Sequence, residues 1–369
     1  MTKPNHQSGR AGRVRESALP TLEDVARSAG VSTATVSRCL NSPDLVVEQT
    51  RTKVLEAVQA LGYAPNFGAR ALAAKRSNTV GAIIPTMENA IFARGLQAFQ
   101  EELDTHGVTL LVASSSYRPA AEATQVRTLT ARGADGLLLI GHDRLTEVYE
   151  FLDRRAMPYV IAWAHDPGSP RASVGFDNFA AMKELATAVL DLGHTRIGLI
   201  SAPTETNDRA RRRLEGVRSA MLDRGLDPQA LRLIETPYAY DTGARAFASL
   251  MQADDRPSVV LCGNDVLAVG ALRQAHKMGL RVPQDVSITG FDDIEIAQVV
   301  TPSLTTVHVP HREMGRQAAL ALVGLINAET TPTSVALGTD IRWRDTLAAP
   351  GGAAPAGESQ DKETLNVRH

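Results

Sequence analysis

Short apolar runs alternate with longer amphipathic stretches from residue 79 onward. The runs of strand length are VGAIIP, VTLLVAS, GLLLI, PYVIA and VGFD in the first half, and RIGLIS, LRLIE, SVVLC, VSITGF and TTVH in the second. Helical patterns fill the gaps, as over residues 91–106 and 265–278. Strands that are apolar throughout, with helices between them, predict parallel sheets covered on both faces. Two series of about five strands predict two similar α/β lobes, with a ligand cleft where carboxyl ends of strands meet.

Residues 21–41, TLEDVARSAGVSTATVSRCLN, have the pattern of two short helices joined by a tight turn. Thr21 can cap the first helix, with Asp24 three residues further on. Gly30 lies at its end, where a sharp turn needs a left-handed residue. Ser32 can cap the second helix, and Val36 faces the small core between the two. This spacing predicts a helix-turn-helix, the geometry that places a helix in the major groove of DNA.

The outward side chains of the second helix are short hydrogen-bonding or apolar groups and one long cation. They are Thr33, Ala34, Thr35, Ser37 and Arg38. An arginine can bond O6 and N7 of guanine together, and a small apolar side chain can contact the methyl group of thymine. Hydroxyl groups more naturally meet phosphates, which position a protein without reading sequence. We therefore predict a DNA-binding helix; the alternative is an ordinary helical hairpin with a polar solvent face.

A third helix is expected from about residue 47 to residue 61. Val54, Leu55, Val58 and Leu61 are predicted to face the hairpin, and Gly62 to end the helix. After a break at residues 63–66 comes FGARALAAKRS, a short, alanine-rich and weakly amphipathic segment. A helix of this length is unstable alone, so we expect it to fold only with DNA and a partner chain.

The formal net charge of −2 is unevenly distributed along the chain. Residues 1–76 carry 11 Lys and Arg against 6 Asp and Glu, whereas the remainder carries 28 against 35. A basic head on an acidic body is expected of a protein whose head alone binds phosphates.

Cys39 and Cys262 lie far apart and match no metal-binding spacing. Cys39 is expected to be a small core residue of the head, and neither cysteine indicates an oxidising compartment. No apolar run follows the basic start, and no window of about 18 apolar residues could span a membrane. The protein is therefore predicted to be cytoplasmic and not associated with a membrane.

The sequence lacks G-x-G-x-x-G, Walker A, G-x-S-x-G, H-E-x-x-H and C-x-x-C patterns. Carboxylates and histidines are scattered, without the pairing that acid–base catalysis needs. We therefore expect no enzyme activity, no cofactor and no metal. Two alternatives remain open, because an α/β body alone does not settle function: a solute-binding protein that feeds a transporter, and a sugar-processing enzyme.

The order of these features resembles the lac repressor/galactose repressor family of transcriptional regulators. The helix-turn-helix is followed by GYAPN, by RALAAK and by two α/β lobes. The motifs GH (193–194), ND (264–265), GFDD (290–293) and RDT (344–346) come in the same order as in the family. The resemblance covers about residues 20–347, and IIPTMENAIFA and VGFDNF are most similar to the gluconate-repressor subgroup.

The resemblance implies a homodimer whose heads bind the two half-sites of a pseudo-palindromic operator in double-stranded DNA. Thr33 and Ala34 would set base preference, and Arg38 would read a base further along. Asn66 and Leu72 would belong to a hinge helix in the minor groove, with Leu72 as the wedge that partly unstacks the central base step. The tail after residue 347 has no leucine heptad, so we expect a dimer and not a tetramer.

Pattern and resemblance together predict a small all-α head and a hinge helix, joined to a body like the periplasmic sugar-binding proteins with two parallel-sheet lobes. The expected boundaries are a disordered basic arm (1–18), the DNA-binding head (19–64), the hinge helix (65–76), the N-terminal lobe (77–177 and 309–337), the C-terminal lobe (178–308 and 338–347) and a disordered tail (348–369).

The body is expected to hold a small polar effector between its lobes. The residues that the resemblance and the strand ends place there are Asn89, Phe92, Trp163, Asp177, Arg213, Tyr238, Asn264 and Asp292. Arg213 is preferred over its neighbours in the basic run ARRR because of its register to Gly216. Asp265 and Asp293 are expected to be structural, with Asp265 capping a helix.

The chain departs from the family after its last crossover, where it has Val309 and His311 instead of the usual glutamine or aromatic residue. An arginine with neighbouring Asn and His would suit a carboxylate as well as hydroxyls. We therefore expect a sugar or a sugar acid such as gluconate. Whether it acts as inducer or corepressor is left open by the sequence.

Overall fold

The computed structural model describes residues 19–41, 43–64, 76–88 and 90–351. The chain divides into two compact units, residues 1–77 and 78–369, which we call the head and the body. The arm, the greater part of the hinge segment and residues 352–369 lie outside the described residues, as do Asn66, Leu72 and Asn89.

The head is a three-helix unit. Its elements are α1 (Leu22–Ala29), α2 (Thr33–Asn41), a 3₁₀ turn (Pro43–Leu45) and α3 (Glu48–Leu61). The side chains of Thr21 and Asp24 form a reciprocal capping box at the start of α1, and Gly30 ends this helix in a left-handed conformation with φ of 67°. The Ser32 hydroxyl accepts a hydrogen bond of 3.1 Å from the backbone N–H of Thr35. The predicted helix-turn-helix and its caps are confirmed.

The core of the head differs from the prediction on α3. The buried cluster consists of Val25, Ala26, Val36, Cys39, Val54 and Ala57. Ala57 replaces the predicted Leu55, which is 48% exposed, because Val54, Ala57 and Val58 follow the i, i+3, i+4 spacing of one helix face. Leu61, in the last turn, is 36% exposed. Gly62 ends α3 in the left-handed conformation, as predicted.

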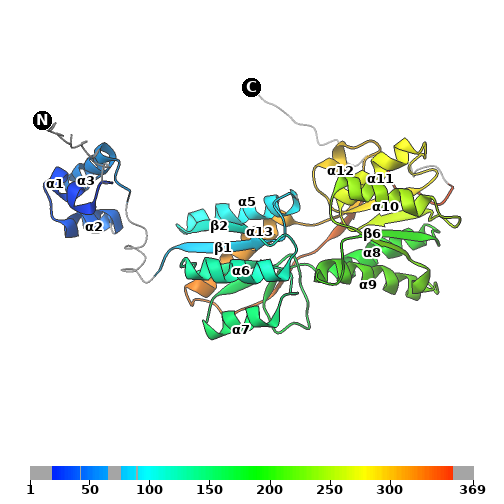
Figure 1. Cartoon of the computed structure of the whole chain (residues 1–369), viewed down its shortest axis with the longest axis horizontal. Coiled ribbons are helices and arrows are strands. Elements are labelled where there is room, and N and C mark those ends of the chain that lie inside the picture. The colour runs from blue at the N-terminus through cyan, green and yellow to red at the C-terminus, as the bar shows by residue number, and fades with distance from the viewer. Residues whose placement is uncertain (1–18, 42, 65–75, 89, 352–369) are drawn as a thin grey trace, which may run out of the picture. The chain divides into compact units, whose positions relative to one another are not determined.

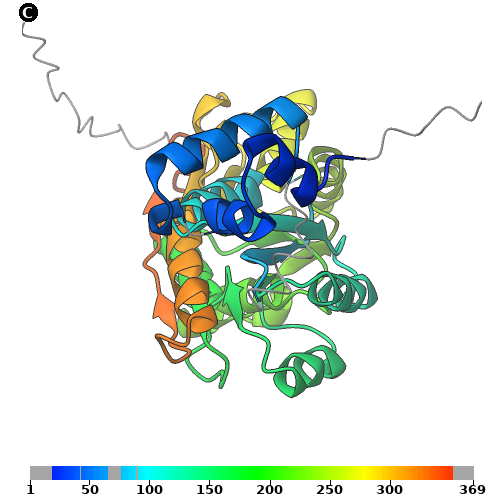
Figure 2. The same cartoon turned by 90° about the vertical axis from the view of Figure 1, so that its left-hand side faces the viewer.

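The first lobe of the body is a six-stranded parallel sheet in the order β11-β5-β4-β3-β1-β2. The strands are β1 (Thr79–Ile84), β2 (Thr109–Ser114), β3 (Gly136–Ile140), β4 (Tyr159–Ala162), β5 (Ser173–Gly175) and β11 (Val335–Ala336). One face packs against α5 (Ala90–Thr105) and α13 (His311–Ile326), and the other against α6 (Pro119–Ala131) and α7 (Thr146–Arg154) (Figure 1 and Figure 2). Alternate residues of the central strands enter these two cores.

The second lobe repeats this plan with the order β12-β10-β9-β8-β6-β7. The strands are β6 (Ile197–Ser201), β7 (Arg232–Glu235), β8 (Val259–Cys262), β9 (Ser287–Asp292), β10 (Thr305–His308) and β12 (Asp340–Arg342). The helices are α8 (Asn178–Asp191) and α9 (Asp208–Asp223) on one face, and α10 (Tyr240–Met251), α11 (Asp265–Lys277) and α12 (Ile296–Val299) on the other; a 3₁₀ turn covers Pro228–Ala230. β12 runs antiparallel to β10, and the other pairs are parallel.

The predicted strands are present, and each sheet has one further strand, β11 or β12. These two were not predicted because two or three residues are too few to form an apolar run. The chain passes between the lobes at residues 176–177, 309–310 and 337–339. Across the described ranges, the helices fall short of the length and apolarity that a membrane span requires.

Helices α5 and α13 cross at two glycines, and this close crossing positions the inner end of the first lobe. A Cβ atom on Gly315 would overlap the backbone carbonyl of Gly95, and one on Gly95 would overlap the ring of Trp163. Only residues without a side chain permit this approach.

We predict that Gly315→Ala lowers the free energy of unfolding of the body by about 1–3 kcal/mol, because the added methyl group overpacks a rigid backbone contact. Gly338→Ala is the matched control, since no heavy atom lies within 4 Å of its Cβ position, and should change stability by less than about 0.5 kcal/mol. Urea unfolding followed by circular dichroism measures both. Equal stability of the two variants would contradict the close crossing.

Candidate functional site

The exposed face of α2 is the candidate DNA-binding surface. Thr33, Ala34 and Arg38 are exposed, whereas Val36 and Cys39 are buried and fix the rotation of the helix. The remaining two predicted residues are half-buried and make local hydrogen bonds. The hydroxyl of Thr35 bonds that of Ser32 over 2.9 Å, and the hydroxyl of Ser37 accepts from Nδ2 of Asn41 over 3.2 Å.

The positive charge of the N-terminal segment lies outside the three-helix unit. Residues 19–64 carry 4 Lys and Arg against 5 Asp and Glu, whereas the flanking residues 1–18 and 65–76 carry 7 against 1. The helix-turn-helix therefore offers shape and hydrogen-bonding groups, and its flanks offer the cations that phosphates attract.

Arg213, on α9, lies in the interior of the body. Its Nε donates a hydrogen bond of 2.8 Å to Oδ1 of Asn178, and its Nη1 donates one of 2.5 Å to the carbonyl of Gly263. Nη2 is 3.8 Å from Oδ1 of Asp292, and the guanidinium lies 3.8 Å above the ring centre of Phe291. Arg213 is thus distinct from the solvated part of the basic run, in keeping with its selection from the sequence.

The other arginines of the run divide between surface and interior. Arg212 is paired with Glu215 at 3.0 Å, and both are half-exposed. Arg209, one helical turn before Arg213, is buried and pairs with Asp208 at 3.0 Å. No sequence pattern selects Arg209, because its burial depends on the first lobe, whose residue Gly141 lies against its guanidinium.

Asp292 and Asn264 face this interior with unused hydrogen-bonding capacity. Both are 1% exposed, and within the described part of the chain Oδ2 of Asp292 and Nδ2 of Asn264 have no hydrogen-bond partner. Burial raises the pKa of Asp292 to about 7, against the opposing effect of Arg213 and Arg209. Buried polar atoms are nearly always paired in folded proteins, so these two atoms are candidates for contact with a polar ligand.

The residue that caps α11 is Asn264 and not its neighbour Asp265. Oδ1 of Asn264 accepts from the backbone N–H of Leu267 over 2.9 Å and caps α11, so the prediction that Asp265 caps this helix is wrong. Asp265 is buried and accepts from the Thr306 hydroxyl at 2.6 Å and from the N–H of Ile294 at 2.8 Å. Its carboxylate therefore fastens β10 and the loop after β9 to α11, which is a structural role.

Trp163 follows β4 and connects the first lobe to the second. Its indole Nε1 donates to Nδ1 of His311 over 3.2 Å, and Nε2 of His311 donates to the carbonyl of Asp292 over 3.2 Å. The same histidine tautomer satisfies both bonds, and burial lowers the pKa of His311 to about 3, so the ring is neutral. Nδ2 of Asn178 donates to the carbonyl of Trp163 over 3.1 Å.

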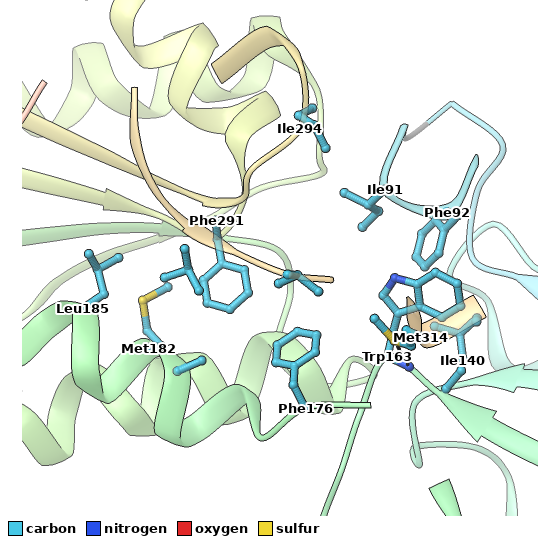
Figure 3. Packing of buried hydrophobic residues seen from close by; sticks show 14 of the residues in the cluster. Ile91, Phe92, Ile140, Trp163, Phe176, Met182, Leu185, Phe291, Ile294 and Met314 are labelled. Carbon is cyan, nitrogen blue, oxygen red and sulfur yellow. Dashed lines mark hydrogen bonds between the residues drawn. The ribbon is translucent and has the colours of Figure 1, made fainter. Parts of the chain in front are cut away.

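Phe92 and Trp163 lie against each other in the hydrophobic core, with ring centres 5.5 Å apart, and each is 2% exposed. Figure 3 shows the pair beside Met314 on the side of the first lobe, and Phe176 and Phe291 on the side of the second. Neither ring offers an exposed face to the cleft, so both are core residues in this arrangement of the lobes. Their contact with effector stays a prediction.

Asp177 is placed away from Arg213. Its Oδ1 caps α8 by accepting from the backbone N–H groups of Phe179 (2.9 Å) and Ala180 (3.1 Å). The adjacent Asn178 turns inward instead, to Arg213 and Trp163. The prediction therefore selected Asp177, whereas Asn178 is the residue that reaches the interior. In an Asp-Asn pair, the sequence does not distinguish the side chain that caps a helix from the side chain that enters a site.

The open part of the cleft lies between strand ends of the two lobes, and Tyr238 is in its wall. This cavity of about 620 Å³ is lined by Thr86, Met87, Glu88, Ser114, Ser116, Tyr117, Ala202, Pro203, Thr206, Asn207, Pro237 and Tyr238. Tyr117, which sequence reasoning missed, pairs with Tyr238 at a ring-centre distance of 6.0 Å. Its position directly after β2, at a strand end, was a signal that could have identified it.

Next to this cavity, polar contacts join the two lobes of the body. Nη2 of Arg211 lies 2.8 and 2.7 Å from the two carboxylate oxygens of Asp143, and Asp208 accepts from the backbone N–H of His142 over 2.5 Å. These contacts enclose a cavity of about 120 Å³ lined partly by Asn178 and Arg209.

Both parts of the chain match known protein families. Residues 21–66 match the family described as bacterial regulatory proteins, lacI family, and residues 186–347 match the periplasmic binding protein-like domain. Among curated proteins, the chain is 34% identical to the HTH-type transcriptional repressor PurR of Vibrio vulnificus (81% of this chain, 90% of the relative). It is 31% identical to the HTH-type transcriptional regulator GntR of Escherichia coli (90% and 98%).

Solved structures of the same architecture cover both parts of the chain. A LacI-family regulator from Silicibacter pomeroyi superposes with a TM-score of 0.81 at 28% identity, covering 89% of this chain and 99% of the other. The lac repressor dimer bound to operator and the anti-inducer ONPF gives 0.79 at 27% identity (89% and 99%). The CelR–cellobiose complex gives 0.66 at 29% identity (89% and 100%). With a helix-turn-helix head, a two-lobed body and relatives that match along nearly their whole length, the chain belongs to the lacI family of bacterial regulatory proteins.

Proposed function

We propose that this ligand-responsive regulator is a repressor that binds a pseudo-palindromic operator as a homodimer and senses a sugar or sugar acid such as gluconate. The observation that carries the proposal is that one chain contains both a candidate DNA-binding surface and a candidate effector site. A helix-turn-helix presents Thr33, Ala34 and Arg38 to solvent, and a two-lobed body holds unpaired polar atoms of Asn264 and Asp292 beside Arg213.

On the DNA side, Thr33, Ala34 and Arg38 read base edges in the major groove. Thr35 and Ser37 support them and contact phosphates, and the basic flanks supply the remaining phosphate contacts. Asn66 and Leu72 act at the operator centre. The lac repressor structure, a dimer bound to operator, supports a homodimer for this chain.

On the effector side, a sugar acid matches the groups available. Oδ2 of Asp292 accepts from a hydroxyl group, Nδ2 of Asn264 donates to a hydroxyl or carboxylate oxygen, and Arg213 supplies the positive charge. Tyr238 covers the C–H face of the ligand. A gluconate-like ligand is supported by the segments IIPTMENAIFA and VGFDNF, which resemble the gluconate-repressor subgroup, whereas the CelR structure is a complex with the neutral sugar cellobiose.

The mechanism is a shift between two arrangements of the lobes. A ligand that bonds the unpaired side-chain atoms of Asn264 and Asp292 acts beside the contact that holds the lobes together, in which the Asp292 carbonyl is joined through His311 to Trp163. The ligand therefore changes the relative stability of the arrangements, which changes the spacing of the two heads in the dimer. Such coupling typically amounts to about 1–3 kcal/mol and is reciprocal between the sites.

The solute-binding alternative accounts for the body but leaves the helix-turn-helix without a role. An enzyme is disfavoured because relatives that match across head and body carry the names of transcription regulators.

Selection from random duplex DNA by the purified full-length protein tests the proposed DNA binding. We expect enrichment of a pseudo-palindrome with symmetric half-sites about a short central step. The selection is run both without ligand and with D-gluconate, because a regulator that needs a corepressor binds its operator only when the ligand is present. Absence of any enriched sequence under both conditions would contradict operator binding.

We predict that Leu72→Ala weakens binding to the selected operator by about tenfold or more, because the wedge that unstacks and bends the central step is lost. The affinity for D-gluconate, measured by calorimetry, should remain within about twofold, since the lobes are untouched. Leu222→Ala, at an exposed position of α9, is the control. An unchanged operator affinity would remove Leu72 from the wedge position.

We predict that Arg213→Ala weakens D-gluconate binding by at least about tenfold, because a charged hydrogen bond contributes about 1.5–3 kcal/mol. Binding to operator without ligand should persist. Arg212→Ala is the matched control, since Arg212 pairs with Glu215 at the surface. A normal gluconate titration for Arg213→Ala, or an equal loss for Arg212→Ala, would show that another arginine binds the effector.

A further inference from the structure

The cleft consists of a polar interior and a mouth with different chemistry. The interior holds Arg213, Arg209 and the unpaired oxygen of Asp292. The mouth is the cavity of about 620 Å³ described above, and its size is in the range of about 300–1,000 Å³ typical of pockets that enclose a whole ligand. A ligand that satisfied only the interior would leave the mouth to solvent.

The tyrosine pair stands at the boundary between these two parts. Tyr117 comes from the first lobe, between β2 and α6, and Tyr238 from the second, between β7 and α10. Tyr117 lines the mouth and also the small cavity that contains Arg209. Charges on Arg213 and Asp292 influence the pKa of both hydroxyl groups, which burial raises. The two tyrosines therefore lie between the charged interior and the mouth that both of them line.

The backbone at Tyr117 is held in an uncommon conformation. Ser116 and Tyr117 have φ of 53° and 55°, in the left-handed region that side-chain-bearing residues rarely adopt. Such residues cluster at ligand-binding positions, where the surrounding structure enforces them. The turn directs the Tyr117 ring across the cleft to Tyr238 instead of leaving it on the outer surface.

Charge distribution fixes the orientation of a ligand that fills both parts. Glu88 is the charged side chain among the described residues lining the mouth, and it is acidic. A carboxylate in the mouth would be repelled, whereas a neutral ring with hydroxyl groups can stack on tyrosine and bond Ser114, Ser116 or Thr206.

We propose that the effector is a glycosylated sugar acid, with its acid unit in the interior and a neutral sugar ring in the mouth, and that Tyr117 determines this preference for the longer ligand. This inference rests on the sugar-acid part of the proposed function. It adds a second sugar unit, its orientation and the residue that selects it.

Calorimetric titration of the full-length protein with three probes tests the proposal: D-gluconate, cellobionate (glucosyl-gluconate) and cellobiose. We expect cellobionate to bind at least about tenfold more tightly than either of the others, since stacking a ring on an aromatic pair is worth about that factor. In Tyr117→Ala the preference for cellobionate over gluconate should fall below about threefold, through a larger loss of affinity for cellobionate than for gluconate. Tyr117→Phe should retain the preference, because it keeps the ring.

Tyr240→Ala is the matched control, because Tyr240 is an exposed tyrosine of the second lobe outside the mouth, and it should retain the preference. Equal affinity for gluconate and cellobionate in the wild-type protein would overturn the proposal and leave the sugar-acid function standing. An equal loss for both acids in Tyr117→Ala would show a merely structural role for Tyr117 and also overturn it. Binding of neither acid to the wild-type protein would overturn both proposals.

Discussion

A closed circuit of polar contacts at the junction of the lobes is the interaction on which the body depends. Arg213 donates to Asn178, Asn178 to the carbonyl of Trp163, Trp163 to His311, and His311 to the carbonyl of Asp292, whose carboxylate returns to Arg213 at 3.8 Å. A buried cation needs partners on every side, and here Trp163 and His311 tie those partners to the first lobe. The circuit therefore couples the charge in the interior to the relative position of the lobes.

Two buried polar atoms beside the circuit have no partner in the described part of the chain. Oδ2 of Asp292 and Nδ2 of Asn264 are buried and unpaired within the described residues, and the pKa of Asp292, raised to about 7 by burial, reflects the same shortage of partners. We propose that a polyhydroxy ligand supplies those partners beside the circuit. Recognition and a change of lobe arrangement would then act through neighbouring side chains of the same junction.

The sequence predicted the parts of the fold that depend on local pattern. Apolar runs located the main strands, and Thr21, Gly30, Ser32 and Gly62 marked helix ends through their own backbone chemistry. The misses depend on tertiary contacts. Ala57 is buried in place of Leu55 because of how α3 rotates against the hairpin, and Asn264, not Asp265, caps α11 because Asp265 is used by Thr306. Tyr117 was missed although it follows a strand end, because its pairing with Tyr238 depends on how the two lobes meet.

The most direct test of the account is reciprocal coupling between the two sites. The affinity of the full-length protein for its selected operator is measured with and without saturating D-gluconate, and its gluconate affinity with and without operator. The account predicts that both affinities change by the same factor, between about 5 and 150. Gluconate that binds to the body while leaving operator affinity unchanged would contradict the account.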